Sequence, residues 1–130
     1  QTRSLAFQPV LPAVGLGFIS TMILNINNMR DMDNDRSAGK TTVALLLGEK
    51  NAKIYHTLLT FGMFACFLQY NFMFAPSPGY RYLYATIFLF QFYILTQLRR
   101  KSGRELDPYL KHTSMAGFLL AVVFTICINI

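Results

Sequence analysis

Three aspartates stand at alternate positions, Asp31, Asp33 and Asp35, directly behind an apolar run from about Val10 to Ile26. Carboxylates that lie so close together either repel one another or share a cation. Oxygen ligands of this kind suit Mg²⁺, which keeps several waters and often bridges carboxylates to the phosphates of a substrate. The segment therefore predicts a site for a metal and a diphosphate at a membrane surface.

Three cations lie in the same segment, Arg30, Arg36 and Lys40. Guanidinium and ammonium groups form charge-assisted hydrogen bonds with phosphate oxygens, so they could hold the oxygens that the metal does not reach. A simpler interpretation stays open. The segment could be a charged loop in water, whose neighbouring acids and bases form weak surface pairs.

The spacing of Asp31 and Asp35 favours a shared partner. If the first helix continues beyond the apolar run, these carboxylates project from one face, one turn apart. Like charges at this spacing destabilise a bare helix, so a metal or a cationic group would offset the repulsion. Asp33 would then point elsewhere, toward the loop or toward Arg30 and Arg36.

Two well-known loop motifs fail at this segment. The acidic spacing that starts at residue 31 begins like a calcium-binding EF-hand, but Arg36 and Thr42 stand where a glycine and a bidentate glutamate are required. Residues 39–41 resemble the end of a P-loop, but Asn34 occupies the earlier glycine position. The sequence supports neither calcium sensing nor nucleotide hydrolysis.

The elements that position these residues are apolar helices. Hydrophobic residues make up 53% of the chain and charged residues only 14%, against a usual soluble value of roughly 25% charged. Four runs lack Asp, Glu, Lys and Arg, and a spanning helix needs about 20 mainly apolar residues. We therefore predict an all-α integral membrane bundle, a single domain over 1–130. Its helices are expected at about 10–28, 54–75, 82–98 and 115–130.

The basic residues predict how the bundle is oriented. Segments 29–53 and 99–112 hold ten of the twelve lysines and arginines. The positive-inside rule then places both segments, and with them the acidic cluster, in the cytoplasm, for a protein of the inner or plasma membrane. The Pro-Ser-Pro-Gly sequence at 76–79 predicts a tight turn between the second and third helices. Nucleic-acid binding would require a continuous basic face, and the sequence shows none.

The motif Asn-Asn-x-Arg-Asp-x-x-x-Asp-x-x-x-Gly-Lys-x-Thr at 27–42, followed by Leu-Leu-Leu-Gly at 45–48, resembles the second aspartate-rich motif of the UbiA superfamily of intramembrane prenyltransferases. The start of the motif is similar to the menaquinone branch, the 1,4-dihydroxy-2-naphthoate polyprenyltransferases. Residues 106–111 resemble the stretch before the last helix of that family.

The resemblance implies a bundle of nine spanning helices, of which this chain corresponds to about the second half. A first aspartate-rich motif in the N-terminal half shares the metals in that family, and nothing in this chain matches it. We therefore expect a C-terminal part of a longer protein that needs the missing N-terminal half, and we expect this chain alone to be inactive.

The resemblance also implies roles for individual residues. Polyprenyl diphosphate and Mg²⁺ would bind between the two motifs, with Asp31 and Asp35 as catalytic metal ligands and Asp33 as a further helper. Lys40 would contact the diphosphate and act in catalysis. Arg30 and Asn28 would contact the diphosphate or orient the aspartates.

The acceptor implied by the menaquinone branch is 1,4-dihydroxy-2-naphthoate, and 4-hydroxybenzoate is the alternative aromatic acceptor. A different class also stays open, a membrane transporter or channel with a cation-binding loop. That class would favour ionisable residues at mid-membrane depth, and the four apolar runs contain no Asp, Glu, Lys or Arg.

Overall fold

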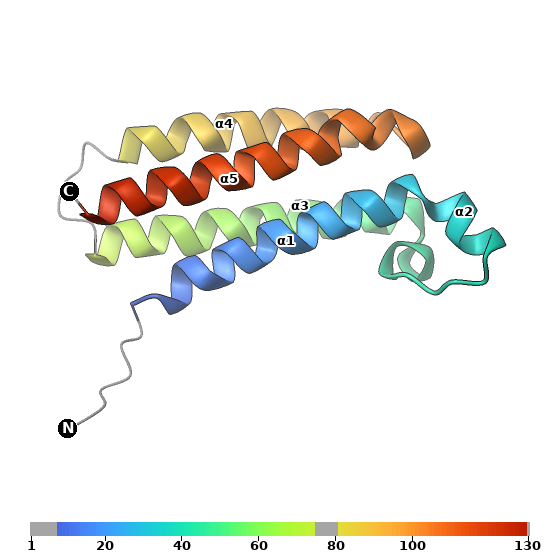
Figure 1. Cartoon of the computed structure of the whole chain (residues 1–130), viewed down its shortest axis with the longest axis horizontal. Coiled ribbons are helices and arrows are strands. Elements are labelled where there is room, and N and C mark those ends of the chain that lie inside the picture. Colours follow the sequence, from blue (N-terminus) through green and yellow to red (C-terminus); the bar gives the residue numbers. More distant parts are fainter. Residues whose placement is uncertain (1–7, 75–80, 130) are drawn as a thin grey trace, which may run out of the picture.

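The regular elements of the chain are all helical in the computed structural model, which describes residues 8–74 and 81–129 (Figure 1). This confirms the predicted all-α class. Three segments are long and apolar enough to cross a membrane: Val10–Arg30, Val43–Phe74 and Gly103–Cys127. A shorter apolar helix covers Tyr84–Leu98. The elements are α1 (Val10–Arg30), α2 (Met32–Ser37), α3 (Val43–Phe74), α4 (Arg81–Leu98), a 3₁₀ turn (Gly103–Leu106) and α5 (Asp107–Asn129).

Two of the helices begin well before the apolar runs that mark them in the sequence. α3 begins at Val43 and α5 at Asp107, whereas the runs begin near 54 and 115. Polar residues continue the backbone hydrogen bonding of a helix into water, so an apolar run marks the depth of the membrane rather than the end of a helix. The turn predicted at 76–79 lies outside the described residues.

The start of α3 is a short separate segment. The Thr42 hydroxyl accepts a hydrogen bond from the Leu45 N–H at 3.3 Å and caps the first turn. Gly48 then adopts φ +76° and ψ 159°, a conformation that favours glycine, and the helix changes direction there. Val43–Leu47 is thus set off from the long part of α3, and Leu46 stays 74% exposed.

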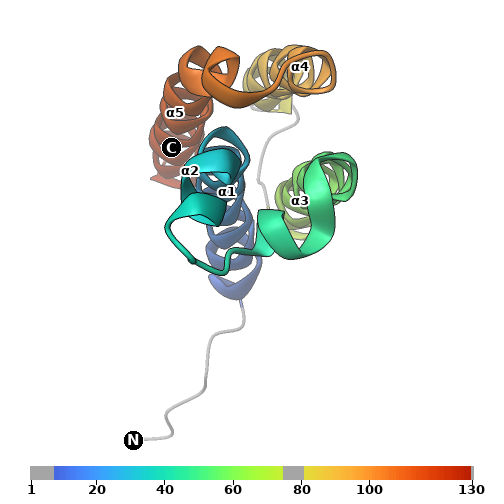
Figure 2. The ribbon, with the colours of Figure 1, turned by 90° about the vertical axis from the view of Figure 1, so that its right-hand side faces the viewer.

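Helix α1 makes the most contacts among the long helices. It packs most extensively against α3 and also against α5, while α4 packs on α5. The end view in Figure 2 shows the four long helices around a common axis, with α2 beyond the end of α1. Contact between α3 and α4 is sparse, which leaves one loose seam in the bundle.

The apolar interior falls into two clusters. The cluster nearer the charged end consists of Ile26, Met29, Ala44, Ala52, Ile94, Leu98, Leu106 and Tyr109. The cluster nearer the other end consists of Ile19, Met63, Phe67, Tyr84, Leu120 and Cys127. α1, α3, α4 and α5 contribute to both clusters, so the bundle has a continuous interior along its length.

A polar layer separates the two clusters. One side chain comes from each long helix, Asn25, His56, Gln91 and Thr113, and none is more than 3% exposed. Asn25 donates a hydrogen bond to the carbonyl oxygen of Ala52 at 2.9 Å and so joins α1 to α3. Within hydrocarbon such groups favour the protein interior over lipid, so all four side chains face the inside of the bundle.

Glycines allow α1 to approach its neighbours closely. A Cβ placed on Gly117 of α5 would lie 2.5 Å from Cγ2 of Ile19, and one placed on Gly15 would lie 2.6 Å from the ring of Phe67. Lipid tails give no hydrophobic drive for helix association, so close packing at small residues supplies much of the attraction. These two contacts place α1 against α5 and α3.

Gly117→Ala should therefore push α5 away from α1. The γ-methyl of Ile19 sits on a β-branched side chain that cannot swing aside, and overpacking of this kind costs about 1–3 kcal/mol. The measurement is the thermal unfolding midpoint in detergent. Gly17→Ala is the matched control, because nothing lies within 4 Å of its Cβ. The control should leave stability unchanged or raise it by up to about 1 kcal/mol. Equal midpoints for the two variants would contradict the close contact.

Candidate functional site

The acidic motif lies where α1 ends and α2 begins. Asp31 leaves the helical conformation, with φ −96° and ψ 9°, although its N–H still donates to the Asn27 carbonyl at 3.1 Å. The Asp35 N–H then donates to the Asp31 carbonyl at 2.8 Å. The helix expected to continue through the motif is therefore broken once, at Asp31, and the two carboxylates have different partners.

Arg30 organises the first half of the motif. Its Nε and Nη2 donate to the two carboxylate oxygens of Asp31 at 2.9 and 2.7 Å, a bidentate pair. Nη2 also donates to Oδ1 of Asn27 at 2.7 Å, and Nη1 donates to Oδ1 of Asp107 at 3.0 Å. Asp107 is the first residue of α5, so this guanidinium ties the end of α1 to the start of α5.

The Asp31 carboxylate is held in its ionised form. The hydrogen bonds from Arg30 lower the pKa of Asp31 from its usual value, and the charges of Lys40 and Arg104 act in the same direction. Its side chain remains 29% exposed. A carboxylate oxygen can accept more than one hydrogen bond or metal bond, so Asp31 can bind a cation while Arg30 holds it.

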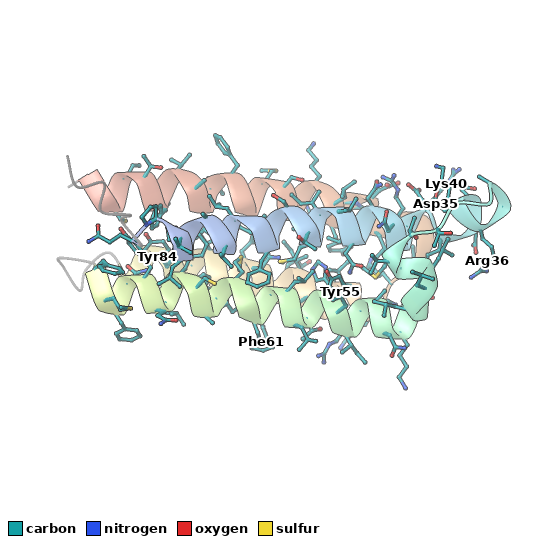
Figure 3. The ribbon with its side chains drawn as sticks, turned by 90° about the horizontal axis from the view of Figure 1, so that it is seen from below. Asp35, Arg36, Lys40, Tyr55, Phe61 and Tyr84 are labelled. Atoms are coloured by element: carbon teal, nitrogen blue, oxygen red, sulfur yellow. The ribbon has the colours of Figure 1, made fainter. Side chains whose placement is uncertain are left out.

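Lys40 folds back onto Asp35. Its Nζ lies 3.2 Å from Oδ1 of Asp35, whose side chain is only 11% exposed, whereas that of Lys40 is 66% exposed. The pair therefore has a carboxylate on the protein side and an ammonium on the solvent side. Figure 3 shows both side chains at the end of the molecule formed by α2 and its loop.

The backbone around Gly39 explains why Lys40 turns back. The Lys40 N–H donates to the Asp35 carbonyl at 2.9 Å, and the Gly39 N–H donates to the Arg36 carbonyl at 3.2 Å. This pair of bonds is the Schellman motif, which ends α2 and requires a left-handed residue. Gly39 has φ +69° and supplies that residue. The Gly-Lys pair of the sequence is thus a helix stop that places a cation beside Asp35.

Asp33 and Arg36 lie apart from that pair. The Asp33 side chain is 99% exposed and 3.8 Å from Nη1 of Arg36. In Figure 3, Arg36 points away from Asp35 and Lys40. Asn28 is half-buried on α1, and it is its neighbour Asn27 that contacts Arg30. The structure therefore divides the residues that the sequence singled out between two faces.

A polar cavity of about 350 Å³ opens on the face of Asp33 and Arg36. Arg30 borders it as well, so this arginine contacts Asp31 on one side and the cavity on the other. The lining residues are Met29, Arg30, Met32, Asp33, Arg36, Gly48, Glu49, Ser102 and Gly103. Sequence reasoning did not point to Glu49 or Ser102, because their relevance depends on contacts between distant segments, and it noted Asp107 only within the stretch 106–111.

The donor set of the motif suits a partly hydrated metal ion. Among residues 8–74 and 81–129, no three side chains of His, Cys, Asp or Glu gather closely enough to hold a metal ion. The motif therefore offers a metal ion two carboxylates, those of Asp31 and Asp35. Mg²⁺ is commonly bound by one or two carboxylates together with waters and substrate phosphates, so these residues fit that ion as partial ligands.

The sequence is similar to proteins of one known family. A family model described as the UbiA prenyltransferase family matches residues 1–120. The 1,4-dihydroxy-2-naphthoate octaprenyltransferase of Escherichia coli (strain K12) is 37% identical over 108 residues, 83% of this chain and 33% of the relative. The protein of the same description from Haemophilus influenzae is 33% identical over 127 residues, 97% of this chain and 41% of the relative.

A more distant relative is the UbiA prenyltransferase domain-containing protein 1 homolog of Drosophila melanogaster. It is 28% identical over 127 residues, 97% of this chain and 34% of the relative. No solved structure gave a significant match. The chain thus spans between a third and about two fifths of the length of these three relatives.

Gly39→Ala should loosen the link between Lys40 and Asp35. A residue with a Cβ is strained at φ +69°, and this costs about 1 kcal/mol in the helix stop. Gly39→Asn should lose less stability than Gly39→Ala, because asparagine tolerates the left-handed region better than alanine. The measurement is thermal unfolding together with hydrogen exchange of the Lys40 amide. Identical exchange rates in the wild-type protein and both variants would contradict the assigned Schellman motif.

Proposed function

Because the chain belongs to the UbiA prenyltransferase family, we propose that the protein carrying it transfers a polyprenyl group from a polyprenyl diphosphate to an aromatic acceptor, with Mg²⁺ as its metal. The observation that carries this proposal is the pairing at the end of α1. Two carboxylates, Asp31 and Asp35, are each held by a cation, Arg30 and Lys40. This is an arrangement suited to a metal–diphosphate head group.

Asp31 and Asp35 are proposed as the metal ligands. When bound, Mg²⁺ would stabilise the negative charge that develops on the departing diphosphate. Arg30 keeps Asp31 ionised and oriented, because its planar fork engages both carboxylate oxygens. Asp33 lies on the exposed face of α2, and its proposed role is to add negative charge near the site.

The cations of the motif have separate proposed tasks. Lys40 is the diphosphate contact, since its ammonium is exposed beside the buried Asp35 carboxylate and retains two further N–H donors. Arg30 borders the polar cavity and can meet a phosphate there, and Asn28 is the neighbouring amide at the end of α1. These residues bind and orient the head group, and the bond that breaks is the allylic carbon–oxygen bond.

The proposed acceptor is 1,4-dihydroxy-2-naphthoate, as in menaquinone biosynthesis. Two relatives that cover most of this chain carry that acceptor in their descriptions. An electron-rich carbon of its ring would attack the allylic carbon as the diphosphate leaves, and the acceptor would lose its carboxylate as CO₂, which gives a prenylated naphthoquinol. The alternative acceptor, 4-hydroxybenzoate, would also react at an electron-rich ring carbon, but it has one aromatic ring instead of two fused rings.

We propose that this chain acts only together with the rest of the family fold. Asp31 and Asp35 supply part of a metal ligand set, and the chain spans no more than 41% of the two naphthoate relatives. The proposed location is the inner or plasma membrane, with the acidic end in the cytoplasm, where Mg²⁺ and soluble metabolites are available. The three long apolar helices support insertion into a bilayer.

Asp31→Asn and Asp35→Asn, each made in the complete protein, should lower kcat/KM about 100-fold or more, because a neutral amide cannot offset the charge of a metal ion. Asp33→Asn is the comparison. Its side chain is 99% exposed, so its effect should be several times smaller. Membrane insertion should be unchanged in all three variants. Full activity in both the Asp31 and Asp35 variants would remove these residues from the mechanism.

The acceptor is tested with membranes that contain the complete protein, a labelled polyprenyl diphosphate and either aromatic acid. The expected product is prenylated naphthoquinol, with at least about tenfold preference over 4-hydroxybenzoate. Product should disappear when EDTA is added and return with Mg²⁺. Preferential prenylation of 4-hydroxybenzoate would reject the naphthoate assignment while retaining the transferase.

A further inference from the structure

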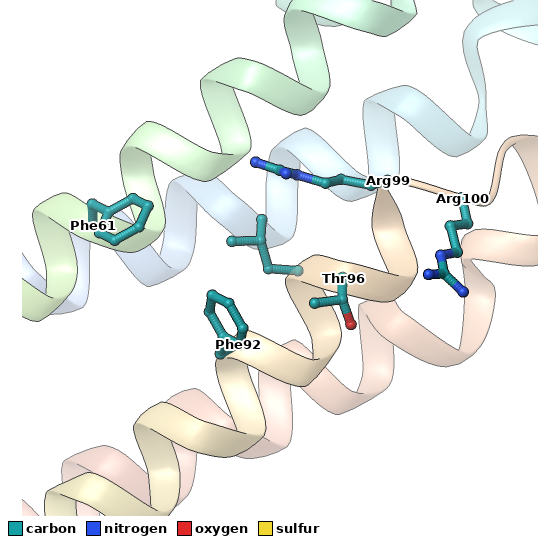
Figure 4. A pocket seen from close by; sticks show the side chains of 6 residues that line it. Phe61, Phe92, Thr96, Arg99 and Arg100 are labelled. Atoms are coloured by element: carbon teal, nitrogen blue, oxygen red, sulfur yellow. The ribbon is translucent and has the colours of Figure 1, made fainter.

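A second cavity, of about 260 Å³, lies in the seam between α3 and α4 (Figure 4). We call it the α3–α4 crevice. Phe61 comes from α3, and the other residues belong to α4 or follow it directly. The lining residues are Phe61, Phe92, Leu95, Thr96, Arg99 and Arg100. The crevice exists because these two helices touch only sparsely, and none of its residues belongs to the acidic motif.

The two arginines of the crevice lack acidic partners in the described structure. Lys101, the next cation, lies with Nζ 5.5 Å from the ring centre of Tyr109. Arg99 and Arg100 are exposed, and neither forms an ion pair with any residue in 8–74 or 81–129. In Figure 4, the Arg99 side chain extends from the end of α4 toward α3, whereas the Arg100 side chain points away from it.

The acids of the chain are committed elsewhere. The sequence contains six Asp and Glu residues. Five form ion pairs with Arg30, Arg36, Lys40 or Lys53, and the sixth, Glu105, accepts from the Ser102 N–H. An anion that neutralises Arg99 and Arg100 must therefore come from a different molecule or segment than those described.

The crevice is amphipathic along its length. Phe92 lies seven residues before Arg99, which is about 10 Å along a helix. Phe61 and Phe92 are 55% and 52% exposed, so an apolar chain can lie against both rings. The arginines stand at the end of the apolar helix, where lipid head groups lie. The shape calls for a ligand with a negative head and an apolar tail.

We propose that the α3–α4 crevice binds one anionic phospholipid, with its phosphate at Arg99 and Arg100 and an acyl chain along Phe61 and Phe92. Basic pockets between spanning helices are suited to anionic head groups. Free phosphate would leave the apolar part of the crevice unused. A second copy of this chain offers, among its described residues, one acid without an ion pair, Glu105, and a single carboxylate does not match two arginines.

The test is native mass spectrometry of the delipidated complete protein, titrated with phosphatidylglycerol or phosphatidylcholine of identical acyl chains. The wild-type protein should bind the first phosphatidylglycerol about tenfold more tightly, since each cation near an anionic lipid contributes appreciably. Arg99→Gln/Arg100→Gln should abolish this preference. Of the two single variants, Arg99→Gln should reduce the preference more than Arg100→Gln. Phe61→Ala/Phe92→Ala should weaken binding of both lipids.

The matched control is Lys50→Gln/Lys111→Gln, which removes two exposed cations outside the crevice and should keep the preference. If the arginine double variant and the lysine double variant lose the preference for phosphatidylglycerol equally, the lipid is attracted by the overall positive charge and not by the crevice. That result would overturn the proposal. Displacement of phosphatidylglycerol by inorganic phosphate, or by polyprenyl diphosphate at equal concentration, would also overturn it. Unfolding midpoints equal to wild type would show that each variant is folded.

Discussion

The close packing of α1 is the constraint on which the rest of the structure depends. In a bilayer, helices gain little by hiding apolar surface from one another, so contact distance decides which helices associate. At Gly15 of α1 the ring of Phe67 from α3 packs directly on the backbone, and at Gly117 of α5 the side chain of Ile19 from α1 does the same. Because the end of α1 carries Arg30 and Asp31, the position of the acidic motif follows from how α1 is seated.

Much of the architecture was accessible from the sequence. Long apolar runs without charge predict spanning helices, since lipid satisfies no backbone hydrogen bonds and a helix satisfies its own within one segment. The acidic motif was also recognisable, because the types and spacing of Asp31, Asp35, Gly39 and Lys40 are local features. The role of Gly39 as a helix stop follows from local backbone chemistry in the same way.

Other features depend on contacts that a linear pattern does not contain. Asp33 and Asp35 lie two residues apart on α2 and so point to different sides, but only the packing of the structure shows that Asp35 is the buried one and Asp33 the exposed one. Asp107 enters the site from the start of α5. α3 begins at Val43 rather than near 54, and the positive φ of Gly48 divides it, although the composition of this polar segment predicted no helix there.

The hydrogen bond between Arg30 and Asp107 joins residues that are 77 positions apart. Closing so long a loop carries an entropic cost that is met only after intervening helices have assembled. During synthesis, α1 is made well before α5 exists. The charged end of the molecule therefore acquires its final order late in folding, when the last helix packs against the first.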